Sequence, residues 1–153
     1  PVKKDLKRIS HYIYTEDPLH FPRFHNERDI SIFNTLAKDS YLDQPKFKSN
    51  NSKINLYNKK LGKQSKFQKY NVLKWEKPSN TICAHLQKDG LRYIHPDAIQ
   101  ARSITMREAA RLQSFPDNFK FTAPNMQIYK MIGNAVAPLM AEKIAEAIKT
   151  TFN

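Results

Sequence analysis

Cysteine and glycine are scarce in this sequence, which has one cysteine and three glycines among 153 residues. A single cysteine excludes an intrachain disulfide and predicts a reducing compartment, so we expect a cytoplasmic protein. Three separate glycines cannot form the glycine-rich loops that hold nucleotide phosphates, and the chain cannot be a self-contained Rossmann enzyme. The apolar runs are too short to cross a bilayer, so we expect no membrane partner.

The side chains that most often carry chemistry are also few. Cys83 lies between Ile82 and Ala84 with no base or helix N-terminus beside it in the sequence, and a buried structural cysteine is favoured over a nucleophile. The histidines lack the spacing of a zinc site, and no cysteine pair accompanies them. We therefore expect no metal and interpret the histidines as polar or packing residues: His11, His20, His25, His85 and His95.

Acidic residues are outnumbered, with 14 against 26 lysines and arginines, which leaves a net charge of +12. Such a balance points to a polyanionic partner. Ten lysines and a single acid lie between Lys46 and Lys77, a stretch that we call the basic region. Its interleaved aromatic, asparagine and serine residues suit a loop that follows a phosphate backbone and reaches base edges. The alternative is a solvated lysine-rich loop that binds nothing in particular.

Turn residues and hydrophobic spacing predict an α+β fold, a small domain with a short antiparallel sheet and few helices. Apolar residues at helical intervals predict a helix over residues 27–38. Residues 81–86 and 91–95 are typical of short strands. The Asp89–Gly90 pair between them is a hairpin turn signal, because both positions tolerate positive φ. We therefore expect these two strands to form the sheet.

Residues 103–121 predict a helix with a well-defined start and stop. Thr105 and Glu108 have the spacing of a capping box, in which each side chain binds a free backbone N–H at the start of a helix. The helix therefore begins at Met106. Pro116 ends it, because proline cannot continue a helix.

Another helix is predicted from Pro138 to about Lys149, because proline suits the first helical position. Gly133 and Asn134, just before it, predict a turn. One face of this helix is apolar and needs a partner, either the core of the same small domain or a larger domain elsewhere. That face consists of Met140, Ile144, Ala147 and Ile148.

Three segments in this order carry a family resemblance: KPSNTICAHLQKDGLRYIHPD, RSITMREAARLQSFPDNFKF and YKMIGNAVAPLMAEKIAEAI. Together they resemble the C-terminal third of bacterial cytosine-5 DNA methyltransferases, from the end of the target-recognition region through the last two family motifs. The similarity extends over about residues 77–149. One departure is Ala137, where the family usually has proline. Because Pro138 still starts the helix, we expect this change to be tolerated.

The resemblance implies two parts. Residues 1–125 would form the small target-recognition domain, with the basic region as its variable part. Residues 126–153 would form a cofactor-wall turn and a C-terminal helix that docks on a Rossmann-like catalytic domain. Family members transfer a methyl group from S-adenosylmethionine to a flipped cytosine, using a Pro-Cys nucleophile and a Glu-Asn-Val motif. Neither motif occurs in this sequence.

The resemblance therefore implies a chain that is inactive by itself and works with a catalytic half, in the same longer chain or in a separate subunit. Two other functions stay open. A free-standing basic DNA-binding module would keep the recognition fold without serving catalysis, and an interaction or structural protein would reuse the fold alone. The IGNAV run at residues 132–136 favours the methyltransferase, because a module without a cofactor needs no cofactor wall.

The resemblance also implies site residues. Thr81 and Ile82 match a Thr-Leu pair that contacts phosphates near the flipped base. The other candidates for contact with double-stranded DNA are Lys59, Lys60, Lys63, Lys66, His85 and Lys88. One wall of the S-adenosylmethionine pocket, complete only with the catalytic half, would come from Gly133, Asn134, Ala135 and Val136. Without that half, the uncovered C-terminal helix favours self-association.

Neutralising Lys59, Lys60, Lys63 and Lys66 together should weaken duplex binding and flatten its salt dependence. Each phosphate contact contributes about −0.9 to the slope of log K against log salt concentration, so the variant loses slope as well as affinity. A titration with a fluorescently labelled duplex at several salt concentrations measures both quantities. An unchanged slope would count against the basic region as the DNA-facing surface.

Overall fold

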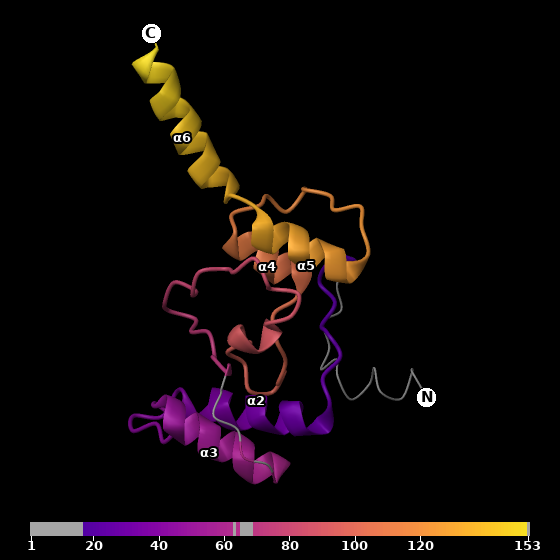
Figure 1. Ribbon diagram of the computed structural model, residues 1–153, viewed down its shortest axis with the longest axis vertical. Helices are drawn as coiled ribbons and strands as arrows, with labels where there is room; N and C mark the ends of the chain where they lie inside the picture. The colour runs from indigo at the N-terminus through magenta and orange to yellow at the C-terminus, as the bar shows by residue number, and fades with distance from the viewer. Residues whose placement is uncertain (1–16, 63, 65–68, 153) are drawn as a thin grey trace.

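The computed structural model describes residues 17–62, 64 and 69–152. Within these ranges Figure 1 shows α2 and α3 at one end of the body, α4 and α5 at the other, irregular segments between them, and α6 projecting away. The elements are α2 (Glu27–Asp39), α3 (Asn50–Leu61), the 3-10 helix η1 (Gly90–Arg92), α4 (Met106–Leu112), α5 (Asn125–Asn134) and α6 (Pro138–Thr151). None of these helices combines the length and hydropathy needed to span a membrane.

The α+β fold predicted from the sequence is wrong, because the described residues form helices and no β-strand. Residues 81–86 run into a series of turns, and Gly90 opens η1 instead of a hairpin turn. Isolated bridges do occur here, since Ile94 pairs with Val72 in parallel and with Ser103 in antiparallel orientation. Three extended segments therefore meet at Ile94, but none of them continues far enough to make a sheet.

In place of the hydrogen bonds between strands of a hairpin, carbonyls of this region bind the side chain of Arg23. Its guanidinium donates to the carbonyl of Gln87 at 2.9 Å and to that of Leu86 at 2.8 Å. The same guanidinium lies 3.5 Å from the ring centre of Tyr129. Arg23 thus bonds to carbonyls at the end of the segment predicted as the first strand and at the start of the predicted turn. Since Arg23 lies 63 positions before Leu86, no local pattern could predict this arrangement.

Two apolar clusters hold the body together. The larger one packs α4 and α5 on the turns after residue 81, and its buried members are Leu19, Ile82, Leu86, Tyr93, Ile104, Met106, Ala109, Ala110, Ile128, Tyr129 and Ile132. The smaller one lies on α2, and its buried members are Ile32, Phe33, Leu36, Tyr70, Ile94 and Ala101. Helix α3 packs against the smaller cluster through half-buried side chains.

The helices predicted over residues 27–38, from Met106 and from Pro138 are confirmed as α2, α4 and α6. The capping box of α4 is present in full, with the side chain of each partner bound to the backbone of the other. Helix α4 ends at Leu112, four residues before the proline that was expected to end it. These signals succeed because each depends on residues only a few positions apart.

Helix α3 lies inside the basic region, where the sequence predicted a loop, so this prediction is wrong. Ser49 is its N-cap and accepts from the Ser52 N–H at 3.1 Å, and Gly62 ends it in the left-handed conformation with φ of 63°. Both caps are visible in the sequence. Most residues between the caps are asparagines and lysines, so the apolar residues show only a weak helical periodicity. Asparagine is also a poor helix former.

An ion pair between a buried arginine and a partly buried glutamate lies on the segment between the two clusters. Arg102 is 2% exposed and donates to both carboxylate oxygens of Glu108 at 2.8 Å. Glu108 also accepts from the Thr105 N–H at 2.8 Å, which completes the capping box. Burial opposes ionisation of this carboxyl, but the bonds from Arg102 outweigh it and hold the pKa of Glu108 below its usual value. Glu108 is therefore ionised and fully engaged.

Histidines that are buried or partly buried extend this network as hydrogen-bonding groups. The Nε2 of His25 lies 2.9 Å from the Ser103 hydroxyl, and the Nδ1 of His20 lies 3.0 Å from that of Thr105. Burial lowers the pKa of His25 and of His95 to about 4. Both are neutral at physiological pH, and no three His, Cys, Asp or Glu side chains of the described residues gather as a metal site would require.

Glu108→Gln should destabilise the chain strongly, whereas Asp117→Asn should barely move the unfolding midpoint. Glutamine keeps the capping contact but leaves the Arg102 charge buried without a counter-ion, a loss of about 3 to 5 kcal/mol. The pair Arg111–Asp117 has the same six-residue spacing and bidentate geometry, yet its side chains are 57% and 63% exposed. Urea denaturation measures both variants, and equal losses would contradict a special role for burial.

Candidate DNA and cofactor site

Residues 80–93 form an open pocket of about 440 Å³. Its rear wall is the fully buried Tyr93, whose hydroxyl donates to the Thr81 carbonyl at 2.7 Å and accepts from the Cys83 N–H at 3.0 Å. Burial raises the pKa of Tyr93 to about 12, so the phenol stays neutral. The two bonds fix the backbone on both sides of Ile82. The pocket is lined by Asn80, Thr81, Cys83, His85, Asp89, Arg92 and Tyr93.

The mouth of this pocket is polar and carries cations. Lys69 lies 2.5 Å from Asp89, and its hydrogen bond lowers the pKa of that carboxyl. Arg92 contacts the other carboxylate oxygen of Asp89 at 3.5 Å and is 47% exposed. The exposed side chains of Thr81 and His85 stand beside this group. Hydroxyl, imidazole and guanidinium groups together can donate to the oxygens of a phosphate.

The structure brings together some of the residues predicted to bind DNA and separates others. Thr81 and His85 share the pocket, while Lys88 is exposed but does not line it. The side chain of Ile82 is buried in the larger cluster, and Ile82 does not line the pocket. Arg92 lines the same pocket but was not predicted as a site residue. The feature of the sequence that could have indicated it is its position just after Asp89 and Gly90.

Two of the predicted lysines lie on α3 and do not line this pocket. Lys59 is exposed, and Lys60 donates to the Ser31 hydroxyl on α2 at 2.8 Å. Lys63 and Lys66 lie outside the described residues. Helix α3 therefore presents part of the basic region as a helix surface rather than as a loop.

Gly133 joins the candidate cofactor wall to the pocket. A Cβ at this position would lie 2.5 Å from the Cys83 carbonyl oxygen and 3.2 Å from that of Ala84. Because nothing larger than hydrogen fits, α5 rests directly on the backbone that the buried Tyr93 fixes. Gly133 and Asn134 were predicted as a turn, but they are the last two residues of α5. Cys83 is half-buried at this contact.

The junction between α5 and α6 is held by the C-cap residue of α4. Gln113 donates through Nε2 to the carbonyls of Ile132 and Ala135 at 3.0 and 3.3 Å. The side chains of Asn134 and Val136 are exposed, Val136 to 61%. An amide next to an apolar surface fits one side of a pocket for a ligand with a polar and an apolar part. Gln113 was not recognised in the sequence, where nothing marks its long-range contacts.

Comparison with known proteins identifies the family. The family model described as C-5 cytosine-specific DNA methylase matches residues 4–150. The chain belongs to this family. In this methylase family, a type II methyltransferase of Bacillus paralicheniformis, M.Bpa9945I, is 40% identical over 134 residues, 88% of this chain and 30% of the relative.

Further relatives agree with this assignment. A putative type II methyltransferase of Oceanobacillus iheyensis is 41% identical over 143 residues, 80% of this chain and 31% of the relative. M.AgeI, a type II methyltransferase of Thalassovita gelatinovora, is 40% identical over 93 residues, 61% of this chain and 21% of the relative. The methylase chain thus spans less than a third of the length of these relatives. No solved structure matches it.

Gly133→Ala should destabilise this methylase chain, although alanine normally favours a helix. The new methyl group would overlap the Cys83 carbonyl, and overpacking of this kind costs about 1 to 3 kcal/mol, more than the gain of up to about 1 kcal/mol from replacing a helical glycine. Asn134→Ala, one residue further on the exposed side, is the control and should have little effect. A rise in the urea midpoint of Gly133→Ala would contradict the close contact.

Proposed function

We propose that this chain is the target-recognition and C-terminal portion of a DNA (cytosine-5-)-methyltransferase and has no methyl-transfer activity without a catalytic half. In this proposal residues 1–125 recognise duplex DNA and residues 126–153 contribute to the cofactor pocket. Family membership supports the reaction class. The absence of Pro-Cys and Glu-Asn-Val motifs from the sequence supports the need for a second part.

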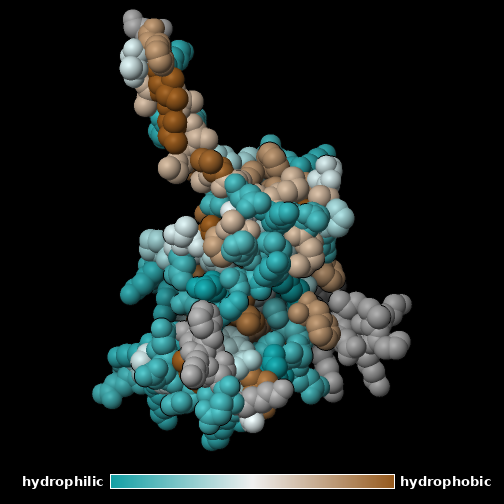
Figure 2. Space-filling model, viewed as in Figure 1, coloured by the Kyte–Doolittle hydropathy of each residue, from teal (hydrophilic) through white to brown (hydrophobic). Residues whose placement is uncertain are grey.

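The apolar face of α6 is the observation that carries this proposal. Its side chains are exposed, Leu139 to 62%, Met140 to 61%, Ile144 to 46% and Ile148 to 53%. Figure 2 shows an apolar stripe along α6, which stands clear of the body. An amphipathic helix of this kind normally buries its apolar face. The catalytic half is the proposed partner, and self-association would cover the same face in its absence.

Contact with double-stranded DNA is proposed for the pocket of residues 80–93 and for the exposed surface of α3. Thr81, His85 and Arg92 supply hydrogen-bond donors for a phosphate, and Lys59 adds an exposed charge. Phosphate contacts fix the register of a protein on DNA without reading its sequence. These residues would therefore position the duplex for the catalytic half.

S-adenosylmethionine is the proposed cofactor, and it supplies the methyl group in this family's reaction. In this chain Asn134 offers a side-chain amide and Val136 an exposed apolar surface at the junction that Gln113 holds in place. Together with the backbone of Gly133 and Ala135 these residues would form one wall of the pocket. One wall cannot enclose the ligand, so we propose that the cofactor binds only when the catalytic half is present.

A chimera tests this proposal. The matching region of the Bacillus paralicheniformis methyltransferase is replaced by this chain, and the transfer of tritiated methyl groups to duplex DNA is measured. The chimera should be active and the 153-residue chain inactive. In the chimera, Asn134→Ala should weaken S-adenosylmethionine binding by about 1 to 3 kcal/mol, the loss expected when one partner of a buried polar contact is removed. Asn118→Ala, at an exposed position, is the control.

Two results would contradict the proposal. Tight cofactor binding or methyl transfer by the isolated chain would show that no catalytic half is needed. A chimera that binds DNA but never transfers a methyl group would favour the free-standing DNA-binding module.

A further inference from the structure

A second pocket lies at the opposite end of the body from the α5–α6 junction, between the end of α2, the start of α3 and residues 71–74. It has a volume of about 220 Å³ and is lined in part by the apolar side chains Leu36, Phe47 and Val72. Three lysines complete it, Lys48 and Lys53 around the start of α3 and Lys74 from the segment of residues 71–74. Since a water occupies about 30 Å³ in the liquid, the pocket has room for a tetrahedral anion.

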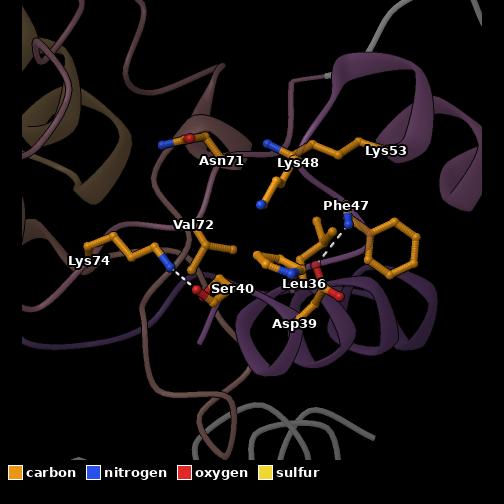
Figure 3. A pocket seen from close by; sticks show the side chains of 10 residues that line it. Leu36, Asp39, Ser40, Phe47, Lys48, Lys53, Asn71, Val72 and Lys74 are labelled. Atoms are coloured by element: carbon orange, nitrogen blue, oxygen red, sulfur yellow. Dashed lines mark hydrogen bonds between the residues drawn. The ribbon is translucent and has the colours of Figure 1, made fainter. Parts of the chain in front are cut away.

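The carboxylate in the pocket has its oxygens engaged by the backbone. Asp39 is 7% exposed, and its two oxygens accept the N–H groups of Lys46 and Phe47 at 2.8 and 2.9 Å. Figure 3 shows the bond to the Phe47 N–H. Asp39 therefore holds the chain that leads into α3, and no ion pair joins it to a lysine within the described residues.

The ammonium groups of Lys48 and Lys53 are directed into this space from the start of α3 (Figure 3). Neither forms an ion pair with any residue that the structure describes, and the first turn of α3 contains no acid. Burial lowers the pKa of Lys53, because the half-buried ammonium is partly withdrawn from water. Two like charges that converge on a pocket are unfavourable until an anion joins them.

Lys74 closes the pocket from the other side. Its ammonium group donates to the Ser40 carbonyl and lies 4.5 Å from the ring centre of Tyr41. These contacts hold Lys74 in place and leave its charge uncompensated by any described carboxylate. The three lysines therefore give the pocket an excess of positive charge, even with Asp39 ionised.

We propose that this pocket binds a phosphate group and that the group is a backbone phosphodiester of double-stranded DNA. This inference rests on the proposed DNA-binding function and assigns it a specific contact. All three lysines belong to the basic region, and Lys48 is exposed at the rim, where a duplex backbone can reach it. Lysine ammonium groups bind phosphate oxygens as point charges with several donors each.

The double variant Lys48→Gln/Lys53→Gln tests the contact in the 153-residue chain. Its affinity for a fluorescently labelled duplex at low salt should fall by about tenfold or more, as for the loss of charge-assisted hydrogen bonds. The slope of log K against log salt should become less steep by about one unit, the contribution of one phosphate. Lys130→Gln/Lys149→Gln removes the same charge from exposed positions on α5 and α6 and should change both quantities much less.

A second measurement separates the DNA backbone from free phosphate as the occupant. Inorganic phosphate is titrated into the parent chain while the side-chain NMR signals of Lys48 and Lys53 are followed. These signals should shift, and a labelled duplex should shift the same signals at far lower concentration. Lys48→Arg/Lys53→Arg keeps the charge and should retain most of the duplex affinity, which shows that the Gln variant fails through charge and not through unfolding.

The possible outcomes are distinct. Equal losses in the Gln variant and in the control variant would overturn the proposal, as would phosphate binding with no effect of the pair on duplex affinity. If the parent chain bound no duplex while inorganic phosphate still shifted both signals, the anion site would be supported and the proposed DNA-binding function would fail.

Discussion

The ion pair between Glu108 and Arg102 is the interaction on which the arrangement of the body depends. Its carboxylate takes both guanidinium bonds and the Thr105 N–H, so it starts α4 and fixes the extended segment that precedes it in a single set of contacts. That segment begins at Ala101, in the cluster on α2, and reaches Ile104, in the cluster under α4 and α5. This segment therefore joins the two clusters, and the ion pair helps a body with few regular elements between its ends to keep a defined shape.

The sequence predicted what local chemistry decides. The capping box at Thr105 and the proline at the start of α6 act within a single helical turn, and both helices are present. The hairpin failed because its turn signal, Asp89–Gly90, competes with contacts from far along the chain: Lys69 binds the Asp89 carboxylate, and Arg23 takes the carbonyls just before it. A pair of residues that tolerates a hairpin turn does not require one when distant cations use the same groups. Helix α3 was missed for the opposite reason, because its caps were visible but its composition was typical of a loop.

The candidate site shows the same division. The exposed polar residues Thr81 and His85 were found through a motif, and the structure brings them to one pocket. Tyr93 and Gln113, which hold the backbone of the two candidate regions, were not found, because each acts by hydrogen bonds to main-chain groups 10 to 22 positions away. Side chains that face a ligand are more easily recognised in a local sequence motif than side chains that hold the site in place. The second kind bonds to main-chain groups that are distant in sequence, and only the folded structure shows which groups these are.

Gly133 sets the position of the α5–α6 junction relative to the pocket of residues 80–93. The glycine places α5 against the carbonyls of Cys83 and Ala84 without space for a methyl group, and the hydroxyl of Tyr93 binds the backbone of Thr81 and Cys83 in the same segment. The backbone of residues 81–84 is therefore held both by the Tyr93 hydroxyl and by close contact with α5. Since residues 81 and 83 line the pocket proposed to contact DNA and the proposed cofactor wall follows directly from α5, backbone contact rather than flexible side chains sets their relative position. A glycine in the last turn of a helix is unfavourable for the helix itself, but a larger residue at this position would overlap the Cys83 carbonyl.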